Sequence, residues 1–167
     1  MIKRMCRLYR NISLVALLIL APISVAQAAD RIPNDIRTAQ QRLQGQQLQV
    51  VKQYISTWVS QLSSGDPEAV AEARGQLMEP TSPGASAIFV TGYSAEAARQ
   101  LNSLLQHEQM LVRLNTMIVA STLTGSGVAD MVVEAVDDPS PAVRYWAGRT
   151  VIKVQTVVGE GEDEQTS

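Results

Sequence analysis

Residues 129–154 constrain the fold of this chain most, because they contain two amphipathic patterns separated by a proline turn. Before the turn, one face is formed by apolar residues at helical spacing: Val128, Met131, Val132, Ala135 and Val136. After the turn, a second face is formed by Val143, Trp146, Ala147, Thr150, Val151 and Val154. The spacing predicts two helices, and Pro139 predicts a break between them. Since neither helix can bury its apolar stripe alone, an antiparallel hairpin is expected.

A related pattern precedes this stretch by 31 residues. Ser94 is expected to cap a helix whose apolar face is Ala97, Ala98, Leu101, Leu104 and Leu105. The following helix begins near Val112-Arg113, which aligns with Val143-Arg144 in the later pair. This period lies within the range of helical-repeat proteins, in which each unit buries its apolar face against the next.

An earlier pair, residues 48–78, follows the same plan less closely. Its first helix has an apolar face of Leu48, Val51, Ile55, Trp58, Val59 and Leu62. Asp66 is expected to cap the second helix, with Pro67 at its first position. Val70, Ala73 and Leu77 line that second helix, but Ala71 stands where the later units have arginine.

The two later units, residues 94–154, resemble HEAT repeats. The residues that carry the resemblance are Asp138, Pro139, Val143, Arg144 and Ala147. In that family the aspartate and arginine tie successive turns together, so the resemblance implies a structural role for Asp138 and Arg144. It also implies an all-α fold, a short right-handed α-solenoid of about three antiparallel helix pairs, which we place at residues 48–158.

Residues 79–93 interrupt the pattern with Pro80, Pro83, Gly84 and Gly92 around the apolar run Ile88-Phe89-Val90. One interpretation is a connector whose apolar residues fill the core, because buried aliphatic runs usually serve packing. The other is a protruding loop that contacts a partner, because loops often carry binding sites.

The N-terminal residues have the layout of a secretory signal peptide. Lys3, Arg4, Arg7 and Arg10 precede a short apolar stretch, and Ala26-Gln27-Ala28 matches a small-x-small cleavage site. We expect residues 1–28 to be removed and the protein to be periplasmic or secreted, with no membrane span after cleavage. The alternative is that this segment is retained as an N-terminal membrane anchor.

The two ends of the remaining chain differ from the repeats. Residues 29–47 are rich in glutamine and are expected to form an exposed helix or a linker. Residues 159–167 form an acidic, glycine-containing tail that is expected to be disordered.

Charge and residue chemistry argue against several functions. Beyond residue 28 there are sixteen acidic and ten basic residues, a net charge of −6 that disfavours nucleic-acid binding. The only cysteine, Cys6, lies in the signal region, and the only histidine, His107, has no second ligand or catalytic partner nearby in sequence. Trp58 and Trp146 are expected in the core. The sequence thus predicts no catalytic residue, no metal site and no cofactor.

The leading functional hypothesis is therefore an exported, non-enzymatic adaptor or scaffold that binds a protein partner. Its specificity would lie on exposed residues of the second helices, for which Arg113, Tyr145 and Arg149 are the candidates. One alternative is a structural envelope protein that self-associates through its Gln-rich N-terminal segment. The other is an accessory subunit that binds a small molecule.

Overall fold

The computed structural model describes the chain from residue 31 to residue 159, with side chains described as far as Val151. The expected signal peptide and acidic tail lie outside the described residues. Within the described range the chain is all-α and contains no strand. It has seven α-helices: α1 (Asn34–Arg37), α2 (Gly45–Leu62), α3 (Pro67–Met78), α4 (Ala87–Leu101), α5 (Met110–Ala120), α6 (Ser126–Ala135) and α7 (Pro141–Gly159). Two short 3-10 helices, η1 (Glu79–Thr81) and η2 (Asn102–Gln106), follow α3 and α4.

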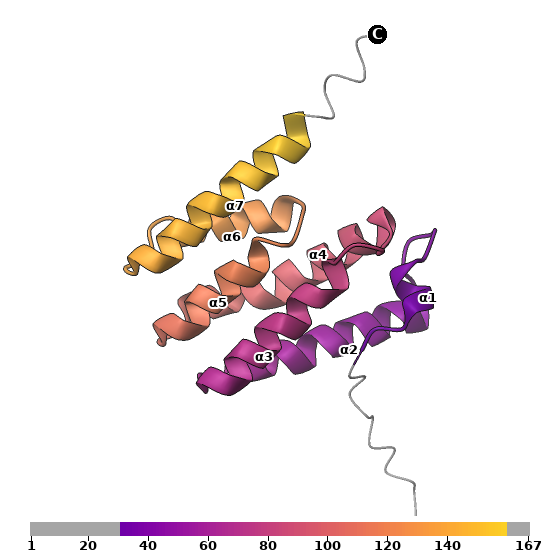
Figure 1. The fold of residues 1–167 in the computed structure, drawn as a ribbon, viewed down its shortest axis with the longest axis horizontal. Coiled ribbons are helices and arrows are strands. Elements are labelled where there is room, and N and C mark those ends of the chain that lie inside the picture. Colours follow the sequence, from indigo (N-terminus) through magenta and orange to yellow (C-terminus); the bar gives the residue numbers. More distant parts are fainter. Residues whose placement is uncertain (1–30, 160–167) are drawn as a thin grey trace, which may run out of the picture.

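The helices are arranged in two layers (Figure 1). In one layer α2 contacts α4 and α4 contacts α6, while in the other α3 contacts α5 and α5 contacts α7. Within pairs, α2 packs on α3 and α6 packs on α7. The predicted all-α class is confirmed, and the apolar faces of successive helix pairs share one core.

Local residues fix the starts of α3 and α6. Asp66 caps α3 as predicted, because its Oδ1 accepts a hydrogen bond of 2.9 Å from the backbone N–H of Ala69. Gly125 precedes α6 with a φ of 100°, a left-handed conformation that glycine adopts at little cost. Gly127 lies inside α6, where an added Cβ would come within 3.2 Å of the Ala98 Cβ. A small residue therefore lets α6 approach α4 closely.

In the segment 79–93, helix α4 begins earlier in the chain than the sequence predicted. The helix begins at Ala87, because Ser86 caps it by accepting a hydrogen bond from the N–H of Phe89. Ser94, the expected cap, is buried within the helix. Phe89 and Tyr93 are fully buried and stack at 5.7 Å, and the Tyr93 hydroxyl donates to the Leu77 carbonyl at 2.8 Å. Of the apolar run Ile88-Phe89-Val90, only Phe89 is fully buried, while Ile88 is 41% exposed and Val90 is partly buried, and all three lie in a helix.

Residues 31–47 are mostly exposed, but three of their apolar side chains pack into the shared core. They contain the four-residue helix α1 and the first residues of α2, and the side chains of Ile32, Ile36 and Leu43 are buried in the shared core. The segment is also fixed to the start of α4, because the Ser86 hydroxyl donates to the Ala39 carbonyl at 2.6 Å. Three apolar side chains among many glutamines are enough to anchor this segment.

The burial of Phe89 makes a testable difference between two neighbouring residues of α4. Phe89→Ala removes a fully buried ring and should lower the free energy of unfolding by about 3–5 kcal/mol. Ile88→Ala, at a side chain that is 41% exposed, should lower it by less than about 1 kcal/mol. Urea unfolding followed by circular dichroism measures both values. Similar losses for the two variants would contradict the placement of Phe89.

Candidate binding surface

The 31-residue period of the sequence reappears in the hydrogen bonds of two arginines. Arg113 Nη1 donates to the carbonyls of His107 and Glu108, at 2.8 and 3.0 Å. Arg144 Nη1 donates to the carbonyls of Asp138 and Pro139, at 2.7 and 3.1 Å. Each arginine therefore holds the turn that precedes its own helix, through backbone acceptors at the same two offsets.

Arg113 also reaches forward to the next helix pair. Its Nε lies 2.8 Å from Asp138 Oδ2, and its Nη2 lies 3.3 Å from Asp138 Oδ1. The two side chains are 12% and 6% exposed, so this is a largely buried ion pair. Burial raises the pKa of the Asp138 carboxyl, but hydrogen bonds from Arg113 and the Ser140 N–H outweigh that effect and leave the pKa below its usual value.

This geometry separates the roles expected for the repeat residues. Asp138 does contact the preceding helix pair, through an ion pair with the Arg113 side chain. Arg144 makes no such contact between pairs, because its guanidinium bonds only to the backbone of its own turn. The expectation that Arg113 is an exposed binding residue is wrong, because Asp138 and two carbonyls occupy its guanidinium. A second polar tie, from Arg74 Nη1 to Asn115 Oδ1 at 2.8 Å, joins α3 to α5.

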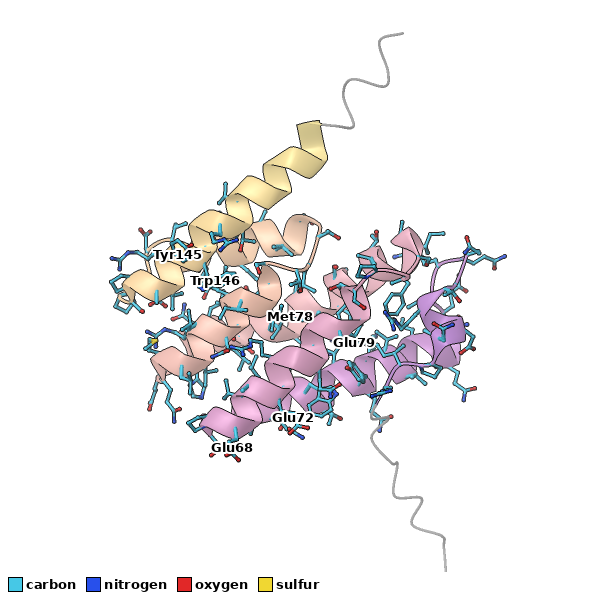
Figure 2. All side chains as sticks on the ribbon, in the orientation of Figure 1. Glu68, Glu72, Met78, Glu79, Tyr145 and Trp146 are labelled. Carbon is cyan, nitrogen blue, oxygen red and sulfur yellow. The ribbon has the colours of Figure 1, made fainter. Side chains whose placement is uncertain are left out.

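The other two candidates, Tyr145 and Arg149, do lie together at the surface of α7. Tyr145 is 60% exposed, and Trp146 beside it is only partly buried, so Trp146 is not a full core residue as expected. The two rings meet edge to face at 6.2 Å (Figure 2). The Arg149 guanidinium carbon lies 5.1 Å from the Trp146 ring centroid and 5.9 Å from that of Tyr145. Cation–π attraction therefore groups these three side chains into one cluster.

The α6–α7 pair exposes positions that the preceding pair buries. Leu105 is 5% exposed, whereas Val136, 31 residues later, is 41% exposed. Asn115 is 3% exposed, whereas its counterpart Trp146 is only partly buried. Val133 lies on α6, one turn before Val136, and is 73% exposed. We call Val133, Val136, Tyr145, Trp146 and Arg149 the end surface. Leu105 belongs to η2, which packs against α5 and α6, whereas Asn115 accepts a hydrogen bond from Arg74 of the preceding helix pair. Among the described residues, Val133, Val136, Tyr145 and Arg149 of the end surface are exposed.

A second surface was not predicted from the sequence. A groove of about 750 Å³ lies between the start of α2 and the first turns of α4, with Arg42, Lys52 and Arg99 among its lining residues. These three bases are far apart in the chain and belong to no motif. They come together through the packing of α2 against α4 and through the segment before α2, which carries Arg42.

The described residues contain few side chains that could act as catalysts or metal ligands. His107 sits in the turn before α5, where its Nδ1 accepts a hydrogen bond of 3.2 Å from the Gln109 N–H. Between residues 31 and 159 there is no group of three or more His, Cys, Asp or Glu side chains that could hold a metal ion. Over the same range no helix has the length and hydropathy to cross a membrane.

Comparison of the chain with family models, with curated proteins and with solved structures found no match. The functional argument therefore rests on the surfaces of the molecule.

The Arg113–Asp138 pair predicts an asymmetric effect of removing arginines. Arg113→Ala leaves the buried Asp138 carboxylate without its charged partner and should lower the free energy of unfolding by about 3 kcal/mol. Arg42→Ala, at an exposed arginine that makes no ion pair among the described residues, should change it by less than about 0.5 kcal/mol. Thermal and urea unfolding measure both. Equal stability of the two variants would show that the ion pair does not hold the helix pairs together.

The same pair predicts how stability depends on pH. Because the folded state lowers the pKa of Asp138 below its usual 3.8, the carboxylate stabilises the fold fully above that value. This contribution is lost as the pH falls through the lowered pKa. The difference in unfolding free energy between the wild type and Asp138→Asn should therefore be largest near pH 7 and shrink below about pH 4. A difference that stays constant down to about pH 3 would contradict an origin in the carboxylate charge.

Proposed function

We propose that this protein is an exported, HEAT-like binding module, a short right-handed α-solenoid that docks a protein partner on its end surface. The solenoid interpretation is supported by the two-layer arrangement, in which alternate helices contact one another along the chain. It is also supported by the repeated arginine–carbonyl hydrogen bonds of Arg113 and Arg144. Export is inferred from the pattern of residues 1–28 alone.

One observation carries the proposed binding role: the period of burial breaks at the α6–α7 pair. Terminal units of helical-repeat proteins usually have a polar outer face, because no further unit covers them. Here the last described pair instead exposes Val133 and Val136 at the end of α6, and Tyr145 of the aromatic cluster on α7. Tyrosine, tryptophan and arginine are the residues that contribute most often to the centres of protein interfaces. The end surface has the composition of a site that a partner covers.

The chemistry of the partner follows from the end surface. Its apolar side chains require an apolar contact, and the Arg149 guanidinium favours a carboxylate beside it. The expected partner is therefore a protein with an apolar patch bordered by acidic residues.

Capture of partners tests this proposal if it depends on the end surface. The tagged full-length chain is expressed in the source organism, and bound proteins are identified by mass spectrometry. The double variant Tyr145→Ala/Arg149→Ala should weaken the captured complex by about 30-fold or more. A control double variant, Met110→Ala/Arg31→Ala, removes an exposed apolar side chain and an exposed base elsewhere and should leave capture unchanged.

Two outcomes would contradict the proposal. One is a partner that the Tyr145→Ala/Arg149→Ala variant retains at wild-type strength. The other is recovery of the bait alone, as a concentration-dependent oligomer that this variant dissociates, which would support self-association through α6–α7. Melting curves of both variants establish that the loss does not arise from unfolding.

A further inference from the structure

The groove between α2 and α4 is a second surface, remote from α7, with its own distinct chemistry. Three pieces of chain enclose it: the segment around Arg42 and Leu43, the first two turns of α2, and one face of α4 from Ala87 to Arg99. Its volume, about 750 Å³, falls within the range of small-molecule sites. The partner-binding role proposed above involves only α6 and α7 and does not use this groove.

The floor of the groove is apolar and is kept open by small residues. Leu43, Leu48 and Ile88 supply the large apolar side chains, and Ile88 is 41% exposed although it begins a buried helix. Gly92 and Ala95 lie one and two turns further along α4 and add almost no side-chain volume. A flexible hydrocarbon chain suits such a floor, because removing each of its CH₂ groups from water against apolar side chains is favourable.

The rim of the groove is basic in a protein that is otherwise acidic. Among the nine lysine and arginine side chains of residues 31–151, six donate a hydrogen bond to another group of the chain: Arg37, Arg74, Arg99, Arg113, Arg144 and Arg149. The three others in that range are Arg31, Arg42 and Lys52, and two of these line the groove. Two of the three described bases that donate no side-chain hydrogen bond thus lie at this groove.

The one acidic residue of the groove is already neutralised. The Glu96 carboxylate is 9% exposed and accepts hydrogen bonds from the Arg99 guanidinium and the Gln100 amide. Burial raises the pKa of this carboxyl, but those hydrogen bonds and the charges of Arg99 and Lys52 leave it below its usual value. Because Arg99 balances Glu96, Arg42 and Lys52 give the rim a net positive charge that attracts an anion.

We propose that this groove binds a single-chain fatty acid. The hydrocarbon chain lies on the floor formed by Leu43, Leu48 and Ile88, and the carboxylate lies at the rim beside Arg42 and Lys52. Neither base is fixed in a hydrogen bond within the protein. The rim therefore offers positive charge, but not the set of converging hydrogen-bond donors that is typical of a phosphate site. An apolar floor with cations at one border matches an amphiphile that has one anionic end.

Displacement of a fluorescent fatty acid tests the proposal on the purified protein. cis-Parinaric acid, kept below its aggregation range, should bind saturably and be displaced by palmitate, whereas hexadecanol of the same chain length should compete at least about tenfold more weakly. Ala95→Phe places a ring in the groove and should weaken binding by about tenfold or more. Ala71→Phe, at an exposed alanine of α3 away from the groove, should bind as the wild type.

A second pair of variants tests the charged rim separately from the floor. Arg42→Gln/Lys52→Gln should weaken binding of cis-parinaric acid about 3- to 10-fold, since each exposed ion pair contributes little alone. Arg31→Gln removes an unpaired base outside the groove and should have no effect. Added salt should weaken binding to the wild type more than binding to the double glutamine variant.

Several results would overturn the fatty-acid site. These are the absence of saturable binding, unchanged binding by Ala95→Phe, and equal competition by palmitate and hexadecanol. Displacement of the probe by an acidic amphipathic peptide but not by palmitate would assign the groove to a peptide instead. None of these results bears on partner capture by α7, whose variants leave the groove intact.

Discussion

The stacking of successive helix pairs depends on an arginine that faces two ways. Arg113 donates to the carbonyls of its own turn and, at the same time, to the carboxylate of Asp138 in the next turn. A buried guanidinium requires acceptors for its donors, and Asp138 in turn requires a positive charge. The pair therefore fixes the register of one helix pair on the next, whereas apolar contacts alone would tolerate sliding. One unit earlier, the Arg74 guanidinium donates a hydrogen bond to the neutral amide of Asn115 and so joins α3 to α5 without an ion pair.

The two ends of the stack of helix pairs differ, because only the α6–α7 end exposes large apolar side chains. At the first end, α3 carries the exposed acids Glu68 and Glu72, which Figure 2 shows on the opposite side of the molecule from Tyr145 and Trp146. At the last end, Arg144 repeats the turn contacts of Arg113 but has no carboxylate ahead of it among the described residues. The acidic end suits solvent, while the aromatic end suits contact with another surface.

The groove follows from the irregular part of the fold. Residues 31–47 cross to the start of α4, where Ser86 bonds to the carbonyl of Ala39, and this crossing brings Arg42 and Leu43 beside Ile88. A regular helix pair at this position would have packed its own residues against α4. The groove thus lies at the irregular segment before α2, whereas the end surface lies on α6 and α7.

The sequence by itself determined the all-helical class, the cap of α3 and the 31-residue period, because these depend on local spacing and on turn residues such as Asp66 and Pro139. It misplaced the start of α4, because Gly92 and the neighbouring prolines suggested a loop, although burial of Phe89 and Tyr93 favours helix there. It placed Tyr145 and Arg149 at the surface but not Arg113, whose exposure depends on an acid 25 residues later in the chain. Only the tertiary structure decided which side chains are covered and that Arg42, Lys52 and Arg99 share one groove. The physical reason is that burial and charge clustering arise between helices, and helical periodicity carries no information about which faces will meet.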